Sequence, residues 1–145
     1  MCIRDRLKDN TDFIVIDVHG ETTSEKMAMA YFFDGKATAL IGTHTHVPTS
    51  DHRIMEKGTA YQTDIGMCGD YNSVIGMNRD NSLNKFLKES STKKHFPALG
   101  KATISGVLVT ADEKTGLALK IQQTDLFKLP STQLARLQIR ISFYL

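Results

Sequence analysis

Two short runs of apolar, largely β-branched residues near the start of the chain predict buried strands. The first covers residues 13–18 and the second covers residues 37–41. An uninterrupted apolar run of this length is typical of a strand buried on both faces of a mainly parallel sheet. Residues 1–12 are mostly polar and cannot supply flanking strands for the first run. We therefore expect the first strand to lack neighbours that a complete sheet would give it.

The segment between the two runs has the pattern of a helix. Thr22 followed by Glu25 fits a capping box, and apolar residues continue as far as Phe32. Asp34 and Gly35 end the helix, with Gly35 suited to the left-handed cap position. Strand, helix and strand form a βαβ unit with parallel strands. The residues that follow each strand then lie at the carboxyl edge of the sheet, where α/β proteins build their sites.

The rest of the chain predicts shorter elements. Residues 54–55 and 59–63 resemble short strands joined by a turn at Lys57 and Gly58, and residues 82–87 a short helix. Residues 64–80, rich in Gly, Asp and Asn, predict a long loop. A hairpin is expected over residues 102–110 and 117–123. The pattern weakens after residue 124, and residues 134–145 fit a helix, a strand or a disordered tail.

Composition narrows the class of protein. The chain has 145 residues, 41% of them hydrophobic and 23% charged, which fits a single soluble globular domain. The formal net charge of +2 is too small to indicate binding to nucleic acid or to an anionic membrane surface. Two cysteines, Cys2 and Cys68, form no disulfide framework and suggest a reducing cytoplasm. No signal peptide is visible, and no apolar run approaches the roughly 20 residues of a membrane helix.

Three of the five histidines fall where a metal site would need them. His44 and His46 alternate with threonines, and in an extended segment side chains two residues apart point the same way. His19 ends the neighbouring strand, so the three imidazoles are expected at one sheet edge, where they could bind Zn, Fe, Mn or Ni. The alternative is that they are surface histidines hydrogen-bonded to the threonines. His52 and His95 lie in polar stretches and are expected to face solvent.

Several longer motifs then occur in order over about residues 11–124, and together they resemble the YmdB-type metallophosphoesterases. The motifs are Asp17 to Lys26 (DVHGETTSEK), Gly42 to Val47 (GTHTHV), Gly58 to Met67 (GTAYQTDIGM), Gly69 to Tyr71 (GDY), Ile75 to Met77 (IGM) and Thr103 to Val107 (TISGV).

This resemblance implies a fold, an activity and a set of ligands. The fold is an α/β class, a calcineurin-like α/β/β/α sandwich. The activity is hydrolysis of small phosphodiesters, namely 2′,3′-cyclic nucleotides and in some members 3′,5′-cyclic AMP. The cofactor is a binuclear centre of iron or manganese, in which His19 and His44 match ligands of one metal and His46 matches a ligand of the other. Asp64 is expected to structure its loop.

The family's amino-terminal ligands are missing from this sequence. Neither the Gly-Asp-x-x-Gly motif near the start nor the Gly-Asn-His motif of the family occurs here. We therefore interpret residues 11–124 as the carboxyl-terminal half of the domain, and residues 1–10 and 125–145 as non-native or unstructured ends.

Such a fragment is expected to bind at most one metal weakly and to be inactive alone, because three neutral imidazoles cannot offset the charge of two divalent ions. Two alternatives stay open: a non-catalytic interaction module and a mononuclear three-histidine site. Exposed sheet edges would favour association into homo-oligomers.

Overall fold

The computed structural model describes residue 7, residues 10–87 and residues 94–125. The expectations for residues 1–6, 8–9 and 126–145 lie outside this part of the chain. The fold is mixed α/β, as predicted, with a four-stranded sheet in the order β1-β2-β4-β3 and a three-stranded sheet in the order β5-β6-β7. The strands of the first sheet are β1 (Val15–His19), β2 (Ala39–Thr43), β3 (Arg53–Ile54) and β4 (Ala60–Gln62).

The predicted βαβ unit is confirmed. β1 and β2 are parallel, in a register that pairs Val15 with Ala39 and His19 with Thr43. Helix α2 (Thr23–Phe33) connects them, and Thr22 is its N-cap, although the Thr22 side chain makes no capping hydrogen bond, so the expected capping box does not form. Gly35 follows the helix with a φ of 75°, the left-handed conformation expected there.

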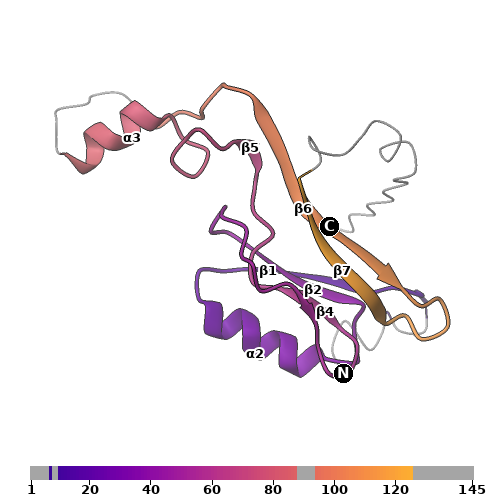
Figure 1. Ribbon diagram of the computed structural model, residues 1–145. Helices are drawn as coiled ribbons and strands as arrows, with labels where there is room; N and C mark the ends of the chain where they lie inside the picture. Colours follow the sequence, from indigo (N-terminus) through magenta and orange to yellow (C-terminus); the bar gives the residue numbers. More distant parts are fainter. Residues whose placement is uncertain (1–6, 8–9, 88–93, 126–145) are drawn as a thin grey trace.

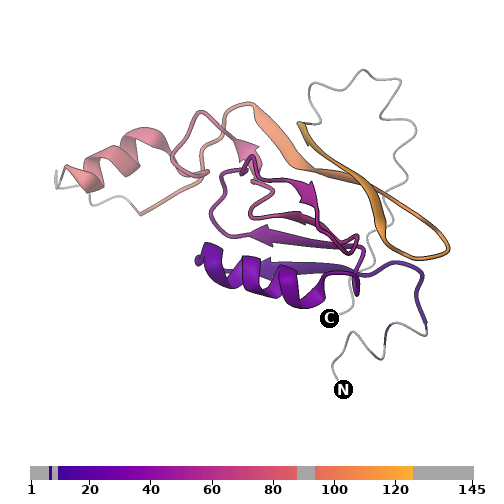
Figure 2. The ribbon, with the colours of Figure 1, turned by 60° about the horizontal axis from the view of Figure 1, so that its bottom comes forward.

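Helix α2 packs its apolar side on one face of the four-stranded sheet (Figures 1 and 2). The core there consists of Ala30 from the helix with Leu40, Met55 and Tyr61. Leu40 and Tyr61 are completely buried. Burying one such side chain contributes about 1.5–3 kcal/mol, so this layer supplies much of the stability of the βαβ unit.

A long hairpin covers part of the opposite face of the same sheet. Its strands are β6 (Ala102–Ala111) and β7 (Ala118–Asp125), close to the predicted bounds, and β7 packs against β3 and β4. Ala39, Ala60 and Ala118 meet in this second core, where small side chains let the two sheets approach closely. Helix, sheet and sheet therefore form successive layers, which agrees with the predicted fold class (Figure 1).

Two expectations for the strands and loops are wrong. β1 is not buried on both faces, because alternate residues are exposed and the Val15 side chain is 63% accessible. Within the described residues β1 has one neighbour, β2, and the hairpin lies over β3 and β4 rather than over β1.

The predicted loop over residues 64–80 is partly ordered into elements. Strand β5 (Cys68–Asp70) pairs with β6, and helix α3 (Arg79–Phe86) begins before the expected residue 82. Helix α3 projects away from both sheets (Figure 1). Neither helix among the described residues has the length and apolar character needed to cross a membrane.

Candidate metal centre

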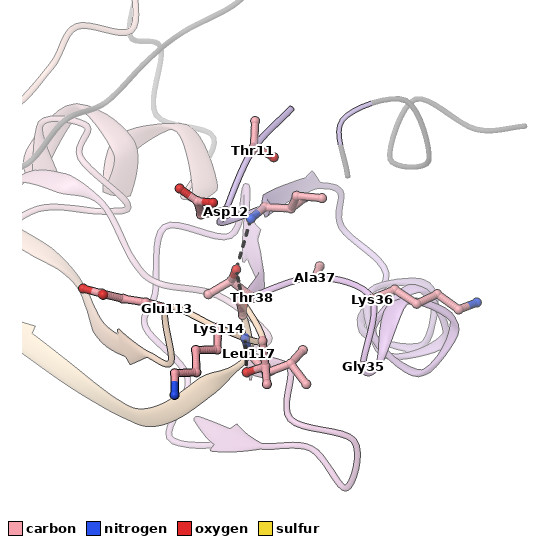
Figure 3. A pocket seen from close by; sticks show the side chains of 12 residues that line it. Thr11, Asp12, Gly35, Lys36, Ala37, Thr38, Glu113, Lys114 and Leu117 are labelled. Atoms are coloured by element: carbon pink, nitrogen blue, oxygen red, sulfur yellow. Dashed lines mark hydrogen bonds between the residues drawn. The ribbon is translucent and has the colours of Figure 1, made fainter. Parts of the chain in front are cut away.

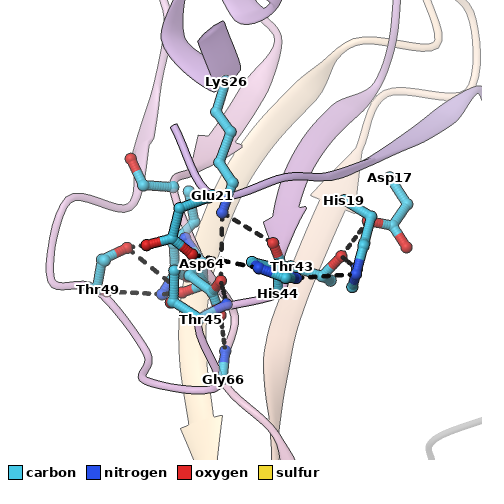
Figure 4. Close-up of polar contacts among 12 residues, drawn as sticks. Asp17, His19, Glu21, Lys26, Thr43, His44, Thr45, Thr49, Asp64 and Gly66 are labelled. Carbon is cyan, nitrogen blue, oxygen red and sulfur yellow. Dashed lines mark hydrogen bonds and ion pairs between the residues drawn. The ribbon is translucent and has the colours of Figure 1, made fainter. Parts of the chain in front are cut away.

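His19 and His44 come together at the carboxyl ends of β1 and β2. His19 Nε2 and His44 Nδ1 lie 3.1 Å apart, with the rings arranged edge to face at 85°. This is the meeting of two strand ends that the βαβ pattern predicts, and Figure 4 shows both rings turned toward each other. Two of the three predicted ligands are therefore neighbours in space.

The Thr43 hydroxyl sets the proton position on His19. It donates to Asp17 Oδ1 at 2.8 Å and lies 3.0 Å from His19 Nδ1. A hydroxyl has one proton, so Thr43 must accept from His19 Nδ1–H while it donates to Asp17. The lone pair of His19 is then on Nε2, the nitrogen that faces His44.

Glu21 is an acceptor for the nitrogen of the His44 ring that faces away from His19. Its carboxylate lies 3.2 Å from His44 Nε2, and both side chains are exposed. A proton on Nε2, donated to Glu21, leaves the lone pair of His44 on Nδ1. Without an ion, the two nitrogens are at hydrogen-bond distance, 3.1 Å, and one proton lies between them; a cation in place of that proton would meet a lone pair from each ring.

The separation of these nitrogens fits a metal ion. A metal–imidazole bond is about 2.0–2.1 Å long, and ligand angles of roughly 90–110° place two such nitrogens about 2.9–3.4 Å apart. Acceptors on the distal nitrogens, as Thr43 and Glu21 provide, are the usual second contacts of metal-binding imidazoles. Within the described residues, however, no group of three or more His, Cys, Asp or Glu side chains is arranged to hold an ion. The pair by itself therefore has the spacing of two ligands but does not make a complete site among these residues.

The segment that holds His44 and His46 is not extended as the sequence suggested, because His44 has a φ of 108° and His46 a φ of 66°. His46 Nδ1 donates to the Ile75 carbonyl at 2.8 Å, so in the neutral ring the lone pair is on Nε2. Ile75 and Gly76 both have positive φ in a tight turn closed by hydrogen bonds between Val74 and Met77, and this turn presents the carbonyl.

A buried ion pair lies behind the histidine loop. The Lys26 side chain, from the first turns of α2, and the Asp64 side chain, after β4, are 1% and 0% exposed. Lys26 Nζ lies 3.3 Å from Asp64 Oδ2 and donates to the Thr43 carbonyl at 2.8 Å. Asp64 in turn accepts from the backbone N–H of Thr45 at 3.0 Å and of Gly66 at 2.9 Å. Asp64 thus organises the loop, in agreement with the sequence interpretation.

The surroundings of Asp64 keep it ionised. Burial by itself raises the pKa of the carboxyl, but the hydrogen bonds from Gly66, Thr45 and Lys26 together outweigh it and lower the pKa below its usual range. The carboxylate is therefore matched to the ammonium group of Lys26, as a buried charge requires.

Sequence reasoning missed Lys26. Its position one turn before Ala30, on the side of α2 that faces the sheet, was the available signal, because a lysine on an apolar helix face needs a partner.

A cavity of about 370 Å³ lies elsewhere, at the amino ends of β1 and β2 (Figure 3). It is lined by Thr11, Asp12, Ile14 and residues 35–38 and 113–117. None of the three histidines lies there, and its side chains of mixed charge do not converge on one point. We therefore place the candidate site at the opposite, carboxyl edge of the sheet. His52 and His95 are exposed, as predicted.

Comparison with known proteins shows which family the chain belongs to. Residues 2–124 match the family model described as YmdB-like protein. The 2′,3′-cyclic-nucleotide 2′-phosphodiesterase of Bacillus subtilis is 47% identical over 113 residues, which are 78% of this chain and 42% of that protein. A crystal structure of a novel phosphatase from Mycoplasma pneumoniae has a TM-score of 0.74 and 38% identity, covering 85% of this chain and 44% of that one.

A second crystal structure, of a hypothetical protein from Thermus thermophilus, has a TM-score of 0.72 and 41% identity over 83% of this chain and 48% of that one. The chain therefore has part of the metallophosphoesterase fold of the Mycoplasma phosphatase. More narrowly, the chain belongs to the family of YmdB-like proteins, a family that includes a phosphodiesterase. It spans less than half the length of these relatives.

Proposed function

We propose that this chain provides part of the metal centre of a phosphodiesterase that hydrolyses 2′,3′-cyclic nucleotides. The single observation that carries the proposal is the 3.1 Å separation of His19 Nε2 and His44 Nδ1. The other nitrogen of each ring has its own acceptor, Thr43 for His19 and Glu21 for His44. In the proposal these two imidazoles bind one ion, and His46 Nε2 binds a second. The family resemblance favours iron or manganese.

Each residue of the site has a defined task in this proposal. A bound ion would supply Lewis-acid stabilisation of a phosphoryl oxygen. Thr43 and Asp17 hold His19 in the tautomer that leaves Nε2 free, and Glu21 holds His44 in the tautomer that leaves Nδ1 free. The Ile75 carbonyl fixes the ring of His46 in the same way.

Among the described residues, no group of three or more His, Cys, Asp or Glu side chains is arranged to hold an ion. We therefore expect the 145-residue protein alone to bind at most one ion weakly and to turn over neither 2′,3′-cyclic nucleotides nor 3′,5′-cyclic AMP.

The exposed free thiol of Cys68 supports a reducing compartment, and we place the activity in the cytoplasm. Association into homo-oligomers and the boundaries of the domain at residues 11 and 124 stay predictions.

The test replaces the matching segment of the Bacillus subtilis relative with residues 11–124 of this chain. The chimaeric enzyme is expected to hydrolyse a 2′,3′-cyclic nucleotide in the presence of manganese or iron, and 3′,5′-cyclic AMP is assayed beside it. His19→Ala and His44→Ala should abolish the activity, whereas His52→Ala, the matched control at an exposed histidine, should leave it unchanged. A folded chimaera that is inactive with every metal would favour the alternative, a non-catalytic module.

A further inference from the structure

The backbone at His44 is in a conformation that it would not adopt unaided. A φ of 108° is unfavourable for a residue with a side chain and persists only where neighbouring contacts impose it. Those contacts lie on both sides of His44. The Thr43 carbonyl accepts from Lys26 Nζ, and the Thr45 N–H donates to Asp64 Oδ2.

The two anchors are joined to each other. Lys26 Nζ and Asp64 Oδ2 form an ion pair at 3.3 Å, and both side chains are within 1% of complete burial. Lys26 extends from α2 and Asp64 follows β4, so the pair ties the helix, the end of β2 and the next loop into one unit (Figure 4). Water cannot replace either partner at this depth, and each depends on the other for its charge balance.

We infer that the Lys26–Asp64 ion pair positions His44, by imposing the backbone conformation that turns its Nδ1 toward His19. This rests on the proposed function, in which His44 Nδ1 and His19 Nε2 hold one ion. Lys26 and Asp64 act on the peptide groups before and after His44 rather than on its ring. They are positioning residues, and their loss should weaken metal binding more than it weakens the fold.

The chain offers a matched control for Asp64. Asp34 is also a buried carboxylate, 7% exposed, and it also accepts from two backbone N–H groups, those of Lys57 at 3.0 Å and Thr59 at 3.3 Å. It organises the turn between β3 and β4, at the end of the sheet away from the histidines. Asp34→Asn and Asp64→Asn therefore each neutralise a buried carboxylate that accepts from two backbone N–H groups, and Asp64 is the one that pairs with Lys26 beside the histidine loop.

The experiment titrates Co²⁺, followed by its visible absorption, into the full chain and its variants, with the thermal midpoint of each recorded. Asp64→Asn and Lys26→Met should weaken Co²⁺ binding by about 10- to 100-fold, the usual effect of losing support around a metal ligand. Asp34→Asn should change it by less than about 3-fold on the same scale. Equal losses of affinity in Asp34→Asn and Asp64→Asn at equal thermal midpoints would overturn the inference. If Asp64→Asn does not fold, Lys26→Met, which keeps the carboxylate and its two N–H donors, decides the matter.

A metal-free measurement separates this inference from the proposed function. Hydrogen exchange of the Thr45 amide and the NMR signals of the His19 and His44 ring nitrogens should change in Asp64→Asn and stay unchanged in Asp34→Asn. If the unaltered protein and His19→Ala bind Co²⁺ equally, the proposed function fails, and these NMR readouts still test the positioning role. Unchanged Thr45 exchange and ring signals in Asp64→Asn would overturn it.

Discussion

The hydroxyl of Thr43 lies between Asp17 and His19, at 2.8 Å from the carboxylate and 3.0 Å from His19 Nδ1. The three residues belong to the ends of two parallel strands, and the register that pairs His19 with Thr43 brings them together. A threonine therefore decides which nitrogen of His19 is available to a metal. This contact could not be assigned from the alternation of threonine and histidine alone.

Thr43→Val keeps the shape of the side chain and removes the hydroxyl. His19 then loses the acceptor that holds its proton on Nδ1, so we expect Co²⁺ affinity to fall about 10-fold or more. The thermal midpoint should change little, because the site is partly exposed. Thr110→Val, at an exposed position of β6, is the control and should bind Co²⁺ normally. An unaltered Co²⁺ affinity in Thr43→Val would show that Thr43 has no role in metal binding.

Gly42→Ala should destabilise the protein strongly. A methyl group at Gly42 would lie 1.7 Å from the Thr63 carbonyl oxygen and 2.9 Å from Lys26 Cδ, so β4 and the buried lysine must both move. We expect a loss of stability at or above the upper end of about 1–3 kcal/mol, measured by urea denaturation. At Gly106 the same methyl group meets nothing within 4 Å, so Gly106→Ala should be neutral. Similar unfolding midpoints for the two variants would contradict the close approach of β2 and β4.

The hydroxyl of Thr59 holds the turn after α2. It is fully buried, accepts from the Gly35 N–H at 3.0 Å and donates to the Ala37 carbonyl at 2.7 Å. Thr59→Val leaves both backbone groups without this partner and should cost about 1–3 kcal/mol in the free energy of unfolding. Thr59→Ser keeps the hydroxyl and should cost clearly less. If serine and valine destabilise equally, the methyl group rather than the hydrogen bonds is what the site requires.

Asp51 should contribute to the acid sensitivity of the fold. Burial by itself raises the pKa of this carboxyl, but hydrogen bonds from Thr49 and Thr63 outweigh it, so its pKa lies below the usual value. Its stabilising effect is therefore complete above the unfolded pKa of about 3.9 and is lost as the pH falls through the lower folded value.

As the pH falls below about 4, the urea midpoint of the unaltered protein should thus drop more steeply than that of Asp51→Asn. Asp80→Asn provides the control, because the Asp80 side chain is 79% exposed and contacts Arg79 at the surface. An equally steep drop in Asp51→Asn and in the unaltered protein would show that other carboxylates govern the acid response.

Much of the architecture could be predicted from local patterns. The two apolar runs, the helix between them and the glycine that ends it define the βαβ unit, and the hairpin bounds follow from alternation around a polar turn. These features depend on residues close together in the chain, so the order of apolar and polar side chains is enough to predict them. The grouping of His19 and His44 follows as well, because parallel strands bring their carboxyl ends to one edge.

Other features depend on contacts between distant segments. The expected burial of β1 on both faces was wrong because the hairpin packs over β3 and β4 and not over β1, which the apolar run itself does not specify. The expected extended conformation at His44 and His46 was wrong. His44 has a positive φ, and the peptide groups on either side of it are held by Lys26 and Asp64, which are distant in the sequence. Lys26 is buried because the carboxylate of Asp64, which follows another strand, pairs with it. This pairing is not visible in the sequence around Lys26.

The sequence by itself therefore determined the family, the βαβ unit, the hairpin, and the meeting of His19 and His44 at one sheet edge. Only the tertiary structure decided the direction of each imidazole and the groups that hold its proton. The physical reason is that element type follows from side-chain periodicity along the chain, whereas ring orientation follows from hydrogen bonds across it: His19 to Thr43, His44 to Glu21 and His46 to Ile75.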